Sequence, residues 1–285
     1  MPLVTTRELV PRAAATRSAV AAFNIITLEH VEAVIAGAES LDAPVVLQVS
    51  ENAVKFRHGR LLPLARAAVV AAERATVPVA LHLDHVQSDD LLRQAADTGF
   101  GSVMYDAAHL PYAENLAATR AAADWAHSQG LWIEAELGEV GGKQGRPALD
   151  AHAHAPGART DPAEARAFVT DSGVDALAVA IGSAHAMTER TATLDHDLLK
   201  RLTTTLDVPL VLHGSSGVRD DELTAAVAGG IAKVNVGTAL NIAMTGAIRE
   251  FLAAHPEAVD SRAYLSVGRD AMADAARRII RLLGR

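Results

Sequence analysis

Three histidines stand at the ends of short apolar segments, where their side chains could converge on one metal ion. His85 ends the segment HLDH, His185 ends GSAH, and His213 lies in VLHG. Neutral imidazoles from different strands can form an open three-nitrogen zinc site that leaves a fourth position for substrate or water. The chain has 12 histidines, so a single one carries little weight. Equivalent placement after three strands is what sets these three apart.

Two carboxylates accompany the histidines. Asp84 directly precedes His85, and a carboxylate beside a metal ion can take a proton from a substrate and return it. Its alternative role is to orient a histidine ligand. Glu136, in the run EAELGEVGG, could be a further ligand or a partner of a ligand histidine. His82 alternates with Asp84, and we expect it to pack inside or to support a ligand.

Two turns near the C-terminal third have the composition of an anion site. HGSSG contains Gly214 and Ser216, and KVNVGT contains Asn235 and Thr238. Small residues let backbone N–H groups approach a phosphate at a helix N-terminus. Barrels often bind phosphate after their seventh and eighth strands. The two turns together therefore indicate a phosphate subsite.

The elements that must position these residues form a repeating pattern. Short apolar, β-branched runs alternate with longer helical stretches rich in Ala and Leu, as in βα units. The runs are apolar on both faces, which is typical of parallel strands covered on both sides. Eight such units predict an α/β fold, a closed (β/α)8 TIM barrel, with a doubly wound open sheet as the lesser alternative. The runs are Ala19–Ile25, Pro44–Ser50, Pro78–Asp84, Ser102–Asp106, Trp132–Leu137, Ala176–Gly182, Pro209–Gly214 and Lys233–Thr238.

Polar residues at the ends of these runs point to the location of the site. Active sites of this fold lie at the C-terminal ends of the strands. A single polar residue there, such as Ser50 or Asp106, is as easily a helix cap or a turn residue. Nearly every run ends in such a group, however, and so many on one rim favour a site.

No low-complexity linker divides the chain. We therefore expect one barrel domain over residues 1–285, with a C-terminal helical extension. The longest connection, near 138–161, is rich in Gly, Ala, Pro and His. Connections of this length are usually lids or disordered segments, and a mobile lid could exclude water from a metal site.

Composition excludes several classes of function. The 285 residues include 26 basic and 34 acidic side chains, a net charge of −8, and 50% are apolar. This acidic balance without a basic block argues against a nucleic-acid or membrane partner. The absence of cysteine excludes disulfides and a thiol nucleophile. The N-terminus lacks signal-peptide features and no apolar run is long enough to span a bilayer, so we expect a cytoplasmic protein.

In sequence order, the motifs AFNIITLEH, HLDH, EAELG, GSAH, LHGSSG and KVNVGT span nearly the whole chain. At these motifs the sequence resembles the class II, metal-dependent ketose-bisphosphate aldolases, which act on fructose or tagatose bisphosphate. The resemblance implies a zinc-dependent lyase of carbohydrate metabolism and glycolysis. It would reversibly cleave a ketose phosphate to dihydroxyacetone phosphate and an aldehyde such as glyceraldehyde 3-phosphate.

The resemblance also implies roles for individual residues. His85, His185 and His213 match the zinc ligands, and Glu136 matches a residue that binds the metal in a second position. Asp84 matches the aspartate that exchanges a proton with the C4 hydroxyl. A monovalent cation near the glycine loops is also implied. The positions matching substrate-binding residues are Asn24, Ser50, Gly214, Ser216, Asn235, Thr238, Arg190 and Arg262.

The resemblance further implies a homodimer or homotetramer. The segment from Asp260 is similar to the part of the family that packs across subunits, and Arg262 would meet the far phosphate from a neighbouring subunit. The chemistry fits a metal enzyme, because Lys143 lies in the long loop and Lys233 begins a strand. Neither is placed to form a Schiff base, so a divalent ion would have to stabilise the carbanion.

Three features depart from the family pattern. Ala186 replaces a glycine after the histidine of GSAH, Lys143 and Gln144 stand where the family has an acidic loop residue, and the run YDAAH leaves Asp106 without a following hydroxyl. The substrate could therefore differ from fructose 1,6-bisphosphate. Two other classes of function also stay open. One is a barrel metallohydrolase, although the first strand ends in Asn24 rather than a His-x-His pair. The other is a catalytically reduced relative that binds sugar phosphate.

Overall fold

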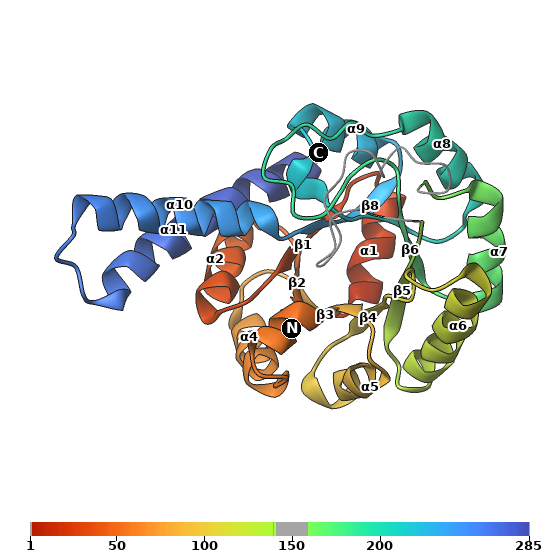
Figure 1. Ribbon diagram of the computed structural model, residues 1–285, viewed down its shortest axis with the longest axis horizontal. Helices are drawn as coiled ribbons and strands as arrows, with labels where there is room; N and C mark the ends of the chain where they lie inside the picture. Colours follow the sequence, from red (N-terminus) through yellow and green to blue (C-terminus); the bar gives the residue numbers. More distant parts are fainter. Residues whose placement is uncertain (1, 139, 141–158, 285) are drawn as a thin grey trace.

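Eight parallel strands close into one barrel in chain order, each pairing with its sequence neighbours (Figure 1). The computed structural model describes residues 2–138, 140 and 159–284. The predicted (β/α)8 barrel and its eight strands are confirmed. The strands are β1 (Val20–Asn24), β2 (Val45–Ser50), β3 (Val79–Val86), β4 (Ser102–Tyr105), β5 (Trp132–Leu137), β6 (Ala176–Val179), β7 (Leu210–Leu212) and β8 (Ile231–Val236).

Helices surround the barrel because the outward side chains of the strands are apolar. In β3, for example, Leu81 and Leu83 lie in the main core between barrel and helices. None of the described helices is long and apolar enough to cross a membrane. The helices around the barrel are α2 (Leu28–Glu39), α3 (Glu51–Phe56), α4 (Leu62–Arg74), α5 (Asp89–Thr98), α6 (Tyr112–Ser128), α7 (Pro162–Ser172), α8 (His196–Thr205) and α9 (Asp220–Ala228), with a 3₁₀ turn η1 (Ser215–Gly217).

Helix α1 (Thr6–Ala15) closes the N-terminal end of the barrel (Figure 1). Leu9 and Ala13 pack among inward-facing residues of β1 to β3, including Val20 and Val46. Val10 packs on the opposite side of the barrel interior, in a second small apolar cluster. Because α1 fills this end of the barrel, a ligand could reach the interior only from the C-terminal ends of the strands.

Above the apolar layer at α1, the barrel interior is polar. Alternate residues of each strand face the same side, so His82 and Asp84 of β3 both point inward. The buried polar side chains of the strands are Gln48, His82, Asp84, Ser102, Glu134, Glu136, Lys233 and Asn235.

Strand β8 begins two residues earlier than predicted and contains a register shift. Leu210 pairs with Ile231, but the next residue of β7, Val211, pairs with Lys233. Ala232 is thus the extra residue of a bulge. The prediction that Lys233 begins the strand is wrong. Lys233 lies within β8, and its side chain faces the same side as that of Asn235.

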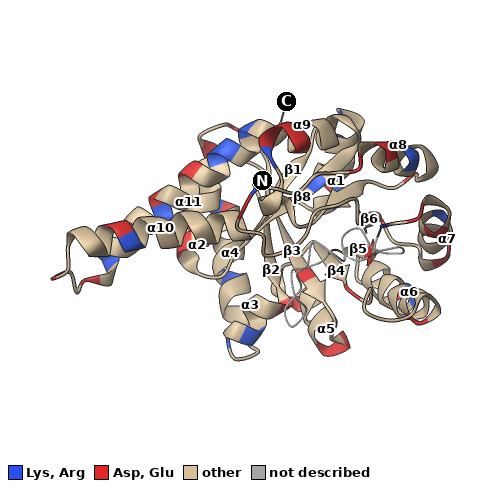
Figure 2. Ribbon diagram, turned by 45° about the horizontal axis from the view of Figure 1, so that its top comes forward, with Lys and Arg blue, Asp and Glu red and all other residues tan. Residues whose placement is uncertain are grey.

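The C-terminal helical extension projects from the barrel as the pair α10 (Thr238–Ala254) and α11 (Ser261–Leu283) (Figure 1). The C-terminal part of α11 packs against α2, where Gly37 allows close approach to Ala273 and Ala276. Charged residues recur along α11, whereas α10 is mostly uncharged (Figure 2). Of the residues of α10, only Leu240 is buried.

Candidate metal centre

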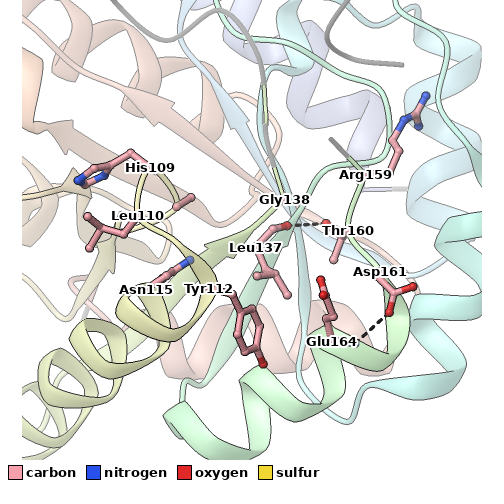
Figure 3. A pocket seen from close by; sticks show the side chains of 11 residues that line it. His109, Leu110, Tyr112, Asn115, Leu137, Gly138, Arg159, Thr160, Asp161 and Glu164 are labelled. Atoms are coloured by element: carbon pink, nitrogen blue, oxygen red, sulfur yellow. Dashed lines mark hydrogen bonds between the residues drawn. The ribbon is translucent and has the colours of Figure 1, made fainter. Parts of the chain in front are cut away.

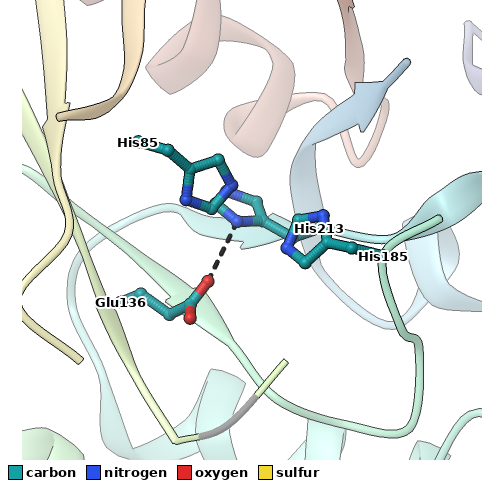
Figure 4. A group of neighbouring side chains, drawn as sticks. All are labelled: His85, Glu136, His185 and His213. Atoms are coloured by element: carbon teal, nitrogen blue, oxygen red, sulfur yellow. Dashed lines mark hydrogen bonds and ion pairs between the residues drawn. The ribbon is translucent and has the colours of Figure 1, made fainter. Parts of the chain in front are cut away.

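Four potential ligands gather at the C-terminal ends of β3, β5, β6 and β7 (Figure 4). The ring centroids of His85 and His213 are 4.8 Å apart, those of His85 and His185 5.0 Å, and those of His185 and His213 5.7 Å. Each histidine and Glu136 offers one ligand atom, and all these atoms lie within 4.8 Å of one another. The structure therefore brings together the four residues that the sequence suggested as ligands.

Asp106 at the end of β4 orients His85. The Nδ1 atom of His85 lies 2.8 Å from Oδ2 of Asp106, whose side chain is buried. A ring that donates from Nδ1 to a carboxylate presents Nε2 as its ligand atom. His85 has a φ of 51°, a left-handed conformation that non-glycine residues adopt at a cost and that recurs at functional sites. From the sequence, Asp106 was as easily a helix cap or a turn residue as a site residue, because its pairing with His85 joins two different strands.

His213 lies between two buried carboxylates of β5. Its Nδ1 is 3.0 Å from Oε2 of Glu136 (Figure 4), and its Nε2 is 2.8 Å from Oε1 of Glu134. Burial opposes the charged ring, but the hydrogen bonds and charges of both glutamates outweigh it and raise the pKa of His213 to about 9. In the metal-free protein the imidazolium therefore donates to both. Glu134 is not among the residues predicted for the site, although its alternation with Glu136 in the run EAE places both side chains on one face of the strand.

Asp84 is held by side-chain amides from neighbouring strands. Nδ2 of Asn24 donates to Oδ2 of Asp84 at 2.8 Å, and Nδ2 of Asn235 donates to Oδ1 at 3.3 Å. Gln48 donates to Oδ1 of Asn24 at 3.0 Å. Burial raises the pKa of Asp84, but interactions with neighbouring basic side chains, first His85 and then His213 and Lys233, outweigh burial and hold this pKa below its ordinary value. The carboxylate is thus ionised and fixed in place.

The two glycine-containing turns lie side by side. The 3₁₀ turn η1 follows Gly214, which has a φ of 66°. A Cβ at Gly214 would lie 2.6 Å from backbone atoms of Ala184, so glycine permits the approach of the GSAH loop. Ser216 accepts a hydrogen bond from the backbone N–H of Ala239 at 3.1 Å. This bond joins η1 to the first turn of α10, which begins at Thr238.

Three other predicted substrate residues have structural partners. Ser50 caps α3 by accepting a hydrogen bond from the backbone N–H of Ala53 at 3.2 Å. Arg190 donates to the carbonyl of Val218 at 2.7 Å and pairs with Asp220. Arg262 pairs with Asp260 at 2.6 Å and has a side chain 90% exposed. Substrate contact stays a prediction for each of them.

A cavity of about 240 Å³ opens beside the C-terminal end of β5 (Figure 3). Thr160 fixes its edge by donating to the carbonyl of Leu137 and accepting a hydrogen bond from the backbone N–H of Ala180 at 2.8 Å. None of the three clustered histidines lines it. The predicted mobile loop, with Lys143 and Gln144, falls largely outside the described residues. The lining residues are Ala108, His109, Leu110, Tyr112, Asn115, Leu137, Gly138, Arg159, Thr160, Asp161 and Glu164.

The chain is similar in sequence and in structure to known proteins. The family model described as "Fructose-bisphosphate aldolase class-II" matches residues 4–285. The crystal structure of the YdjI aldolase from Escherichia coli K12 is 32% identical, with a TM-score of 0.84 over 99% of this chain and 97% of that one.

Two further structures are similar. A putative fructose-1,6-biphosphate aldolase from Coccidioides immitis is 29% identical, with a TM-score of 0.86 over 98% of this chain and 95% of that one. The fructose-bisphosphate aldolase from Campylobacter jejuni is 22% identical, with a TM-score of 0.81 over 99% of this chain and 95% of that one. The last similarity supports the fold alone.

Proposed function

Because this chain belongs to the class II fructose-bisphosphate aldolase family, we propose that it is a zinc-dependent aldolase. It reversibly cleaves a ketose phosphate into dihydroxyacetone phosphate and an aldehyde. The observation that carries the proposal is the convergence of His85, His185 and His213 directly beside Asp84. Three imidazoles, together with the carboxylate of Glu136, are donors that suit Zn²⁺ and leave room for substrate.

His85, His185 and His213 would hold the ion, and Glu136 would hold it in a second position. When bound, the ion supplies a Lewis acid that polarises the C2 carbonyl oxygen of the ketose. Asp106 keeps the ring of His85 oriented, and Glu134 does the same for His213. Partners of this kind tune ligand basicity and ring position.

Asp84 supplies the proton transfer. During cleavage, its carboxylate accepts the proton of the C4 hydroxyl, the C4–O bond becomes a carbonyl, and the C3–C4 electron pair stays with the ketone half, which then takes a proton from solvent at C3 to become dihydroxyacetone phosphate. In condensation, Asp84 returns the proton. Ionised Asp84, held by Asn24 and Asn235, is in the protonation state that cleavage requires.

The phosphate of the ketone half would bind at the joined turns. Gly214 and Ser216 lie on one turn and Thr238 on the other, and the bond from Ala239 to Ser216 holds them together. Backbone N–H groups at a helix N-terminus favour a phosphate there. Glycine at position 214 matters because a side chain would collide with Ala184.

A second copy of the chain would complete the far phosphate site. Arg262 is the second residue of α11, which begins at the outer end of the projecting helix pair (Figure 1). The arginine is therefore remote from its own barrel mouth. Ile242 and Leu252 of α10 are exposed, and a partner subunit would cover them. We infer a homodimer, or a homotetramer built from it, in which Arg262 crosses to the neighbouring site.

The test is a retro-aldol assay on fructose 1,6-bisphosphate, tagatose 1,6-bisphosphate and other ketose phosphates, with metal analysis of the purified protein. We expect stoichiometric zinc and cleavage of at least one ketose phosphate that a chelator abolishes. Zinc without cleavage, together with hydrolysis of a phosphate or amide, would favour the metallohydrolase. Phosphate binding without zinc or cleavage would favour the catalytically reduced relative.

A further inference from the structure

Lys233 is a fully buried lysine inside the barrel, beneath the candidate metal centre. Its Nζ atom lies 2.8 Å from Oε2 of Glu134 and 2.8 Å from Oδ1 of Asn235. A buried ammonium group is costly unless it is paired and hydrogen-bonded. Lys233 and Asn235 are two residues apart in β8 and both are buried, so the alternation of the strand brings this charge inside.

The ammonium group determines which way the amide of Asn235 faces. An amide has an accepting oxygen and a donating nitrogen, whereas an ammonium group only donates. The oxygen of Asn235 therefore faces Lys233, and its nitrogen faces Oδ1 of Asp84 at 3.3 Å. The flipped amide would place its nitrogen against the ammonium group and its oxygen against the carboxylate. Both contacts would be repulsive.

We propose that Lys233 is a positioning residue for cleavage of the C3–C4 bond. By holding the oxygen of Asn235, Lys233 keeps the amide nitrogen on Asp84 and so keeps the carboxylate aimed at the C4 hydroxyl. Lys233 touches no reacting atom. Asn24, held in turn by Gln48, fixes the other carboxylate oxygen. The inference rests on the proposed role of Asp84.

Two partial reactions separate this role from a general structural one. Exchange of the C3 hydrogen of dihydroxyacetone phosphate with solvent involves only the ketone half and does not use the C4 hydroxyl. Cleavage of the ketose phosphate requires Asp84 to accept the C4 hydroxyl proton. A misoriented Asp84 carboxylate should therefore slow cleavage much more than exchange.

The experiment compares Lys233→Met with Lys200→Met, the same change at an exposed position of α8. We expect Lys233→Met to lower kcat for cleavage about 10- to 100-fold, the scale of a small misplacement of a reacting group. Zinc content should be unchanged, and KM and C3 exchange should be affected much less than cleavage. Lys200→Met should change none of these quantities.

A second pair of variants keeps the test valid if Lys233→Met does not fold. Glu134→Gln with Lys233→Met leaves no unpaired buried charge at this ion pair, and Glu134→Gln alone is its reference because Glu134 also contacts His213. Compared with Glu134→Gln alone, the double variant should cleave the ketose phosphate more slowly but exchange the C3 hydrogen at a similar rate. Equal losses of cleavage and exchange, loss of zinc, or unchanged cleavage would each overturn the proposal.

Crystal structures of the same variants test the inference independently of the proposed function. We expect Nδ2 of Asn235 to move beyond hydrogen-bond distance of Asp84 when Lys233 is absent. An unchanged contact would overturn the positioning role. If the parent protein cleaved no ketose phosphate, the proposed function would fail, and the inference as a catalytic statement would fail with it. The amide geometry would still report whether Lys233 orients Asn235.

Discussion

His85 and Asp106 end neighbouring strands, and the Nδ1 atom of the histidine lies 2.8 Å from a carboxylate oxygen of the aspartate. The bond fixes a ring whose backbone already adopts a left-handed conformation, with a φ of 51°. Because the two constraints act together, the ring of His85 is oriented before any ion binds. Such preorganisation reduces the entropy cost of forming a metal site.

Removal of the Asp106 carboxylate should weaken metal binding. We expect Asp106→Ala to lower zinc affinity about 10- to 100-fold, as is usual when a ligand histidine loses its outer partner. Competition with a chromophoric chelator measures this affinity. Asp90→Ala, at an exposed position on α5, is the matched control. Unchanged affinity in Asp106→Ala would show that the aspartate does not support the site.

Loss of the Asp84 charge should stop proton transfer without removing the metal. Asp84→Asn is expected to reduce cleavage by about 10²- to 10⁴-fold, the usual contribution of a general base. The zinc content should be unchanged. Steady-state assays and metal analysis check both quantities, with Asp97→Asn as the exposed control. A variant that kept full cleavage would exclude Asp84 as the base.

The metal-free protein should lose stability as the pH rises from about 6.5 to about 9. The pKa of His213 is raised to about 9 in the folded state, whereas an unfolded histidine titrates near about 6.5. The bound proton therefore stabilises the fold fully below the unfolded pKa, and this contribution is lost as the pH rises through the folded pKa.

Urea unfolding of chelator-treated protein across this range measures the effect. The pKa of His82 is lowered to about 3 by burial and by the charge of Lys233, so His82 stays neutral throughout the window. Bound zinc should replace a proton on His213 and remove the slope, and so should His213→Gln. A flat profile in the metal-free parent would contradict the raised pKa.

Replacing Ala186 by glycine should stabilise the folded protein. It has a φ of 58°, and the left-handed conformation costs a residue with a Cβ roughly 1–2 kcal/mol. After the entropy cost of glycine, Ala186→Gly should raise the free energy of unfolding by about 0.5–1 kcal/mol. Ala163→Gly, in the first turn of α7, should lower it. Chemical denaturation of both variants measures whether the free energy of unfolding rises in Ala186→Gly and falls in Ala163→Gly.

The proposed exchange of Arg262 between subunits predicts complementation. Asp84→Asn and Arg262→Ala should each be impaired alone, the second through a higher KM for substrates with a distal phosphate. In a mixed dimer, the Arg262→Ala subunit keeps Asp84 and receives Arg262 from its partner, so one site is intact. Activity should therefore recover on mixing, after subunits exchange. A mixture no more active than the sum of its parts would place Arg262 outside the neighbouring site.

The local pattern of the sequence was enough to predict the barrel and the histidine cluster. Mostly apolar runs such as that of β2 (Val45–Ser50) recur with helical segments between them, and parallel strands end at the same rim. Residues directly after those runs, such as His85 and His213, must therefore approach one another. The start of β8 was placed two residues too late: Ile231 and Ala232 belong to the strand, and the register shift between Ile231 and Lys233 cannot be seen in the sequence.

The contacts that orient these groups were decided only by barrel closure. Glu134 meets His213 and Lys233 across 79 and 99 residues of chain, and alternation alone shows that each faces inward, not which one it touches. Strand register and the bulge set those distances. Periodicity fixes which residues share an interior, whereas hydrogen-bond geometry over a few ångströms depends on how the closed sheet staggers its strands.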